Sequence, residues 1–304
     1  MVVYGLSRCS KTIMKDKMKY ALLWVAIKAV AIWPYWVLHA ISSVLYPIIY
    51  YVVGYRRAVV IKNLTNAFPE KSASEIAKIE KDFYRHFCDY LVETVKLMHI
   101  SDEQMKRHMR FVNPELIEQL RQDGRPIFLY LGHQGNWEYV ISITMWIHPN
   151  LAAVQVYHPL KDKVMDRLMY RLRSRFNSVG VSQKQTLRAV LGMMREGRQP
   201  LLGLIADQRP NRRPDPVWME FLHQDTPIIT GGEVMGRKLD AHFVYGSMRC
   251  VRRGYYELTF CPIEPVEGEE CGYSKQYMRM LEQDIKAQPH MWLWTHKRWS
   301  MKRG

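Results

Sequence analysis

The densest group of reactive side chains in the sequence is a short motif in which four residues separate His133 from Glu138. The apolar run at 126–132 predicts a buried strand that leads into the motif, and the residues after the motif predict a helix. On one continuous helix the two side chains would be rotated by about 140° from each other, so they can meet only if the chain turns between them. Gly135 and Asn136 favour such a turn, because glycine adopts left-handed conformations and asparagine caps helices. We therefore expect Glu138, in the first turn of the helix, to fold back on His133.

A histidine held by a carboxylate is the working half of an acyl-transfer site. The carboxylate fixes the ring tautomer, and the free ring nitrogen takes a proton from an attacking hydroxyl. No serine or cysteine adjoins His133 or Glu138, so a covalent acyl-enzyme is not required and an acceptor hydroxyl can attack an activated acyl group directly. Backbone N–H groups at the helix start could hold the oxyanion. A histidine in a strand-end loop can equally be structural. Metal catalysis is a weak alternative, because the sequence offers His133 and Glu138 no third metal ligand at a recognisable spacing.

Short apolar runs alternate with helical stretches from residue 126 onward, which predicts an α/β domain with a mixed, largely parallel central sheet flanked by helices. The expected strands are 126–132, 151–157, 199–206, 218–222, 241–251 and 255–263. The expected helices are 56–97, 137–147, 162–176, 187–196, 232–239 and 273–287. The last two strands read as a hairpin, which makes that part of the sheet antiparallel. In such sheets the site lies beyond the carboxyl ends of the strands, where His133 falls.

The most apolar part of the chain precedes this domain. From residue 29 to residue 55 there is no Lys, Arg, Asp or Glu, and a helix of that length would reach roughly 40 Å, enough to cross a bilayer core. Pro34 and Pro47 would kink or split it, so two shorter helices lying partly in the membrane are as compatible with the sequence as one span. Basic residues flank both ends, which fits a segment that dips into the cytoplasmic leaflet.

These patterns divide the 304 residues into three parts. Residues 1–17 are a basic N-terminal extension, residues 18–55 are a membrane anchor made of one helix or a kinked helical hairpin, and residues 56–304 are the catalytic domain. Residues 1–17 are polar and lack periodicity, and the stretch that begins at Met18 would make a natural start of the chain. We therefore expect Met14 or Met18 to be the physiological initiator.

The composition narrows the class of protein further. Hydrophobic residues make up 48% of the chain, which excludes an intrinsically disordered protein. The net charge of +15 calls for an acidic partner: nucleic acid, an anionic membrane or an acidic protein. Nucleic-acid binding would account for the charge alone, because no zinc-finger spacing or RNP-like aromatic motif occurs and the apolar anchor would go unexplained. The five cysteines lack metal-ligand spacing and indicate reduced thiols.

A His-x-x-x-x-Glu motif after a strand, behind an apolar anchor and within a basic α/β domain, resembles the late acyltransferases of lipid A biosynthesis, a branch of the lysophospholipid acyltransferase superfamily. The resemblance covers nearly the whole chain from about Met18, including the segments at 55–60 and 63–70 that follow the anchor. It implies that His133 is the general base, that Glu138 is its partner, and that the acyl donor is an acyl carrier protein or another acyl thioester.

Further site residues follow from the same resemblance. Arg173, in the basic stretch at 170–176, matches the family's functional arginine best, with Arg171 and Arg175 one helical turn or less away. Asp207, after the expected strand 199–206, resembles the family's aspartate-containing loop and would orient the catalytic centre or the acceptor. We assign substrate-binding roles to a set of three residues: Asn136, Arg173 and Asp207. A solvated basic helix face and a turn-capping aspartate are the alternatives for the last two. Arg209 stands where enteric lipid A enzymes carry a second aspartate.

The sequence therefore predicts a membrane-associated O-acyltransferase that needs no cofactor. It would move a fatty acyl chain from an acyl carrier protein to a hydroxyl of a lipid A precursor, at the inner membrane with the catalytic domain facing the cytoplasm. The nearest alternative keeps the chemistry but acts on a lysophospholipid or an aminoacyl lipid. A non-enzymatic basic membrane-surface protein is the alternative from a different class, and it would leave the His133 motif and the Asp207 loop unexplained.

Overall fold

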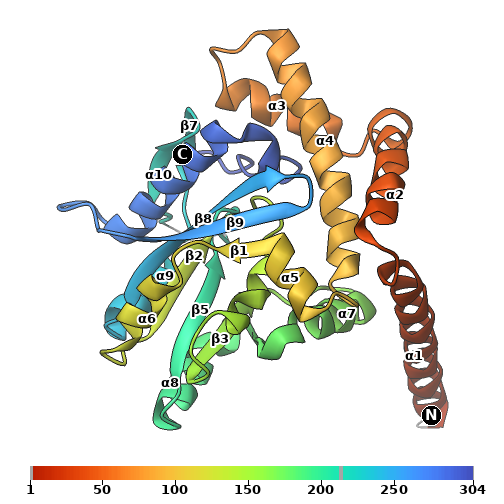
Figure 1. Ribbon diagram of the computed structural model, residues 1–304, viewed down its shortest axis with the longest axis horizontal. Helices are drawn as coiled ribbons and strands as arrows, with labels where there is room; N and C mark the ends of the chain where they lie inside the picture. The colour runs from red at the N-terminus through yellow and green to blue at the C-terminus, as the bar shows by residue number, and fades with distance from the viewer. Residues whose placement is uncertain (1–2, 212–214, 304) are drawn as a thin grey trace.

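The structure, a computed structural model, describes residues 3–211 and 215–303, with side chains from residue 15 onward. One sheet organises the described residues, with strand order β1-β9-β8-β2-β5-β3-β4 (Figure 1). Neighbouring strands run parallel except β8 and β9, which form the antiparallel hairpin that the sequence predicts. The bounds are β1 Met109–Phe111, β2 Ile127–Leu131, β3 Leu151–Tyr157, β4 Val179–Ser182, β5 Gln199–Ile205, β8 His242–Arg252 and β9 Tyr255–Pro262, with a separate hairpin of β6 Trp218–Phe221 and β7 Gln224–Pro227.

Helices cover both faces of this sheet (Figure 1). The α-helices are α1 Val3–Ala31, α2 Tyr35–Pro47, α3 Arg57–Ala67, α4 Ala73–Lys96, α5 Asp102–His108, α6 Glu115–Arg121, α7 Lys163–Arg173, α8 Thr186–Arg195, α9 Gly231–Lys238 and α10 Gly272–Ala287. A π-helix, η1, spans Ile48–Val53. The 3₁₀ helices are η2 Trp137–Met145, η3 Arg175–Asn177, η4 Gln183–Gln185 and η5 Pro289–Met291. The predicted α/β class and the mostly parallel sheet are confirmed.

The central strand β2 separates two apolar layers. Successive side chains of a strand point to opposite faces. Phe128 and Tyr130 belong to the layer that also contains residues of α4, α10 and the aromatic C-terminal segment, while Leu129 and Leu131 belong to the layer that contains residues of η2, α5 and α6. Every residue of β2 is buried. A strand covered on both faces reads as a continuous apolar run, which is why the sequence at 126–132 predicts it so clearly.

The differences from the sequence prediction are local. The expected helix 56–97 is two helices, because the chain turns between α3 and α4 at Phe68 and Pro69. The expected helix at 137–147 is the 3₁₀ helix η2. The strands β1, β4 and β7 have three or four residues each and are too short for a recognisable hydrophobic alternation.

The N-terminal segment is broken as its prolines predict. Pro34 separates α1 from α2, and Pro47 closes α2 ahead of the π-helical η1. The described part of residues 1–17 lies within α1, so the boundary expected at residue 17 falls inside one continuous helix. In Figure 1, α1 extends away from the sheet while α2 lies along α4. Lys19 of α1 pairs with Asp162 at the start of α7, with 2.7 Å between Nζ and Oδ2.

Candidate active site

His133 and Asp207 meet at the carboxyl edge of the sheet. Leu131 of β2 lies beside Ile205 of β5, and each functional residue stands two positions further along its own parallel strand. Nδ1 of His133 lies 2.6 Å from Oδ1 of Asp207, and the backbone N–H of His133 donates to Oδ2 over 2.8 Å. Adjacent parallel strands therefore bring together two residues that are 74 positions apart in the sequence.

Asp207 is held as a buried carboxylate. Its side chain is 1% exposed, and the indole N–H of Trp292 donates to Oδ2 over 2.8 Å. Burial acts to raise the pKa of Asp207, but the electrostatic interaction with His133 and the hydrogen bonds from His133 and Trp292 outweigh it and lower that pKa below its ordinary value. The ionised form of Asp207 is thus the one that the surroundings stabilise.

The pairing with Asp207 fixes which ring nitrogen of His133 is free. Because Oδ1 of a carboxylate only accepts, Nδ1–H of His133 donates to it and Nε2 carries the lone pair. The side-chain amide of Gln208 donates toward Nε2 over 3.3 Å. This is the tautomer that a general base needs, since Nε2 can take a proton from a bound hydroxyl.

The expected pairing of Glu138 with His133 is wrong. Gly135 does make the predicted turn, with a φ of 61°, but Glu138 points to Arg173 of α7 instead. Its two carboxylate oxygens accept from Nη2 and Nε of Arg173 at 2.5 and 2.9 Å, a two-pronged ion pair. Glu138 is buried, with 2% exposure. Among the described residues, Arg173 is the cation that pairs with its carboxylate. The carboxylate that contacts His133 is that of Asp207, which follows β5, the neighbour of β2 in the sheet, and does not belong to the His133 motif.

Each of the three candidate arginines has its own contact. Arg173 pairs with Glu138. The guanidinium of Arg171 lies over the ring of Trp24 in α1, 4.0 Å from its centroid. Arg175 donates to backbone carbonyls, including that of Ile100 over 2.9 Å. Only Arg173 of the three lines the cavity described next.

A cavity of about 370 Å³ opens beside His133, between η2 and the face of the sheet made by β2, β5 and β3. Its wall is largely apolar. The polar groups at the mouth are those of His133, Glu138, Arg173 and Gln208, and Gln155, Tyr157, His158 and Ser178 also belong to the lining. The apolar lining comes from the three strands and from Val140, Ile141 and Ile143 of η2. A cavity that combines reactive polar groups at its mouth with a largely apolar wall suits a molecule with a reactive head and a long apolar tail.

A comparison with known families decides what class of enzyme this is. A sequence model of the bacterial lipid A biosynthesis acyltransferases matches residues 8–301. The chain belongs to this family. Two curated relatives are a lipid A biosynthesis palmitoleoyltransferase of Escherichia coli (strain K12) and a lipid A biosynthesis acyltransferase of Shigella flexneri. Each is 22% identical over 289 residues, which cover 93% of this chain and 92% of the relative.

The acyltransferase holds Asn136 away from its cavity. Asn136 is fully buried, and its Nδ2 donates to Glu93 of α4 over 2.9 Å. It makes no side-chain cap on η2, so the capping expectation is wrong, and it is not among the described residues that line the cavity. Next to it, the carbonyl of Gly135 accepts from Nε2 of His86, whose pKa burial lowers to about 4, so this ring is neutral. Both contacts fix the loop that carries His133.

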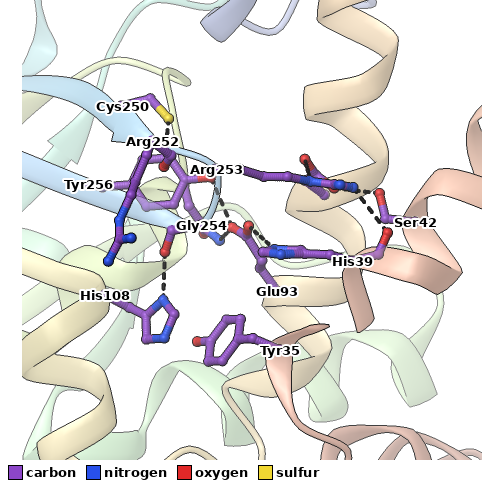
Figure 2. Close-up of polar contacts among 12 residues, drawn as sticks. Tyr35, His39, Ser42, Glu93, His108, Cys250, Arg252, Arg253, Gly254 and Tyr256 are labelled. Atoms are coloured by element: carbon purple, nitrogen blue, oxygen red, sulfur yellow. Dashed lines mark hydrogen bonds and ion pairs between the residues drawn. The ribbon is translucent and has the colours of Figure 1, made fainter. Parts of the chain in front are cut away.

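Sequence reasoning about the acyltransferase missed Glu93. This carboxylate is 0% exposed and accepts from His39 of α2 over 3.1 Å and from the hydroxyl of Tyr256 over 2.9 Å (Figure 2). It also accepts from Asn136. One helical turn earlier, Asp89 accepts from Arg253 at the hairpin turn. The available signal is that the two acidic residues stand four apart, on one face of an otherwise amphipathic helix.

The described residues of the acyltransferase contain no group of three or more His, Cys, Asp or Glu side chains that could hold a metal ion.

Proposed function

We propose that this acyltransferase moves a fatty acyl chain from an acyl carrier protein thioester to a hydroxyl of a lipid A precursor. The observation that carries the proposal is that Nε2 of His133, oriented by Asp207, stands at the mouth of an apolar cavity. Membership of the lipid A biosynthesis acyltransferase family supports a lipid A precursor as the acceptor.

In the proposed reaction the acyl chain lies in the cavity with its thioester carbonyl beside His133. Nε2 takes the proton of the acceptor hydroxyl as its oxygen attacks the carbonyl carbon. When the tetrahedral intermediate collapses, the new C–O ester bond remains, the C–S bond breaks, and the imidazolium returns its proton to the leaving thiolate. Asp207 stays ionised throughout and stabilises the imidazolium. The amide N–H of Gln208, 3.3 Å from Nε2, can donate to the oxyanion.

The Glu138–Arg173 ion pair forms one wall of the mouth. A guanidinium that already gives two hydrogen bonds to a carboxylate keeps further N–H groups for a second anion, since arginine has five. We assign it to the positioning of the head of a substrate rather than to proton transfer. The overall charge of +15 supports docking of an acidic carrier protein and an anionic lipid.

We also propose that α2 and η1 lie on the cytoplasmic surface of the inner membrane rather than across the membrane. Among the described residues, one helical stretch, Tyr35–Val53, is long and apolar enough to cross a bilayer. One face of α2, however, is fixed to the domain: Ser42 donates to Asp89 over 2.5 Å, and Arg253 donates to the carbonyl of His39 (Figure 2). A spanning helix would carry this charged cluster into hydrocarbon.

The opposite face of this segment is exposed and apolar. The exposed side chains include Trp36 at 74%, Val44 at 63% and Val52 at 79%. A helix with one face bound to a polar domain and the other face apolar fits an interfacial position.

Acidic substitutions on that face should weaken binding to lipid vesicles. We expect Trp36→Glu and Val52→Glu each to reduce partitioning onto phosphatidylglycerol-containing vesicles by about tenfold or more, because each large side chain contributes roughly 1.5–3 kcal/mol when it leaves water. Co-sedimentation of the full chain measures this. Val234→Glu, at a 48% exposed position in α9, is the matched control and should bind normally. Unchanged binding of both variants would refute the surface assignment.

The reaction itself is tested with the purified full chain, an acyl carrier protein thioester, and a lipid A precursor that carries a free hydroxyacyl chain. We expect an ester product with one additional acyl group by mass spectrometry, and its absence with His133→Ala. Transfer to a lysophospholipid or an aminoacyl lipid, with none to the lipid A precursor, would replace the proposed acceptor. Full activity of a folded His133→Ala protein would refute the mechanism.

A further inference from the structure

The floor of the cavity is a ladder of side chains in register across β2, β5 and β3. The pairing of these strands places them in rows from the mouth inward: Leu131 with Ile205, then Leu129 with Gly203 and Gln155, then Leu201 with Ala153. Residues 201 and 205 are four positions apart on one strand, so the rows span about 13 Å at about 3.3 Å per residue. The cavity therefore has depth along the strands as well as width.

The innermost row closes the cavity. Leu201 and Ala153 are 2% and 4% exposed, and both belong to the apolar layer beneath η2. Ile143 of η2 covers the cavity from the other side and is 2% exposed. An acyl chain that enters beside His133 thus runs along the strands toward a wall of packed hydrocarbon.

Gly203 stands in the middle of this path and leaves it open. Its neighbours at positions 201 and 205 point to the same face of β5, which is the cavity face. A Cβ built on Gly203 would meet one atom within 4 Å, the carbonyl oxygen of Val154 at 3.5 Å, which is ordinary van der Waals contact. A larger side chain here would extend into the cavity rather than into packed atoms.

Glycine is disfavoured in a strand interior, because it adds backbone entropy to the unfolded state and buries no side chain. The φ of Gly203 is not in the left-handed region, so its backbone does not require glycine. The pairing of β5 with β2 and β3 is regular at Gly203, so a bulge does not explain the glycine; the remaining reasons are close approach of another backbone or of a ligand, and the cavity beside Gly203 favours a ligand.

We propose that Gly203 determines the length of the acyl chain that this enzyme transfers, with Leu201 as the end wall. This inference rests on the proposed function, since it assigns the donor's hydrocarbon tail to the cavity. A side chain at position 203 would block the path one row short of the end, and a smaller one at position 201 would extend the path.

The test is a competition among acyl carrier protein thioesters with short, medium and long saturated chains, using the full chain and the accepted lipid. We expect Gly203→Val and Gly203→Leu to shift the transferred chain to shorter lengths while the shortest donors keep near-normal kcat/KM. Each methylene group that can no longer enter should reduce kcat/KM by about fourfold, because burying one contributes about 0.8 kcal/mol. Leu201→Ala should shift the preference to longer chains.

Gly192→Leu is the matched control, because a Cβ at Gly192 of α8 meets no atom within 4 Å and this residue is outside the cavity lining. Its chain-length profile should equal that of the wild type. Gly203→Ala serves as the milder variant if the larger ones do not fold. Transfer by the wild type, with the same profile in every folded variant at positions 203 and 201, would overturn the inference alone. A wild type that transfers no acyl chain of any length would instead overturn the proposed function.

Discussion

The Asp207→Asn enzyme should lose about 10⁴-fold in kcat while it remains folded, by analogy with other carboxylate-oriented histidines. The reason lies in how the carboxylate is held. Oδ2 accepts from both the backbone N–H of His133 and the indole of Trp292. In the variant, the amide oxygen must therefore take the Oδ2 position, and the NH₂ group takes the Oδ1 position and faces Nδ1. Nδ1 then has to accept, the proton moves to Nε2, and the base is lost.

Single-turnover measurement of ester formation from a thioester donor checks this expectation. The matched control is Asp284→Asn, the same change at a carboxylate that accepts from Tyr245 and lies outside the cavity lining. Glu138→Gln should reduce the rate less than Asp207→Asn, because Glu138 contacts Arg173 and not His133. If Glu138→Gln abolished transfer while Asp207→Asn remained active, the assignment of Asp207 as the orienting carboxylate would be wrong.

The sequence predicts His133, Arg173 and Asp207 as site residues, and the structure places His133 and Arg173 on one cavity and Asp207 against His133, but the sequence misassigns the partner of the histidine. A motif read along the chain favours partners that are close in sequence, such as Glu138. The actual partner depends on which strands are neighbours, and the alternation of strands and helices alone does not specify that β5 lies beside β2. Two residues that each follow a buried strand by the same interval were the signal available.

Other features depend on tertiary contacts that no local pattern contains. Asparagine is a common helix cap, but Nδ2 of Asn136 donates to the buried carboxylate of Glu93, and its Oδ1, the atom that would cap the helix, accepts from no described group. The break at Pro34 was predictable from the missing N–H of proline. The attachment of α2 to the domain was not predictable, because it depends on Ser42, Asp89 and Arg253, which come from three distant parts of the chain.

The largest expected effect on stability comes from the Glu138–Arg173 pair. Arg173→Met should lower the free energy of unfolding by about 3–5 kcal/mol, because it leaves Glu138 as an uncompensated buried charge. The side chain of Glu138 is 3% exposed whereas that of Arg173 is 27% exposed, so the penalty falls on the carboxylate. Urea unfolding at neutral pH, followed by circular dichroism in the detergent used for purification, measures the change.

The double variant Glu138→Gln with Arg173→Met separates charge from packing. Removing both charges should restore most of the stability, because a neutral amide costs far less to bury than an ion. Acyl transfer should nevertheless stay impaired, since the guanidinium at the cavity mouth is gone. Arg171→Met is the control on the same helix, where the guanidinium lies over Trp24 and outside the cavity lining. A double variant as unstable as Arg173→Met would show that α7 depends on the arginine's packing rather than on the neutralisation of Glu138.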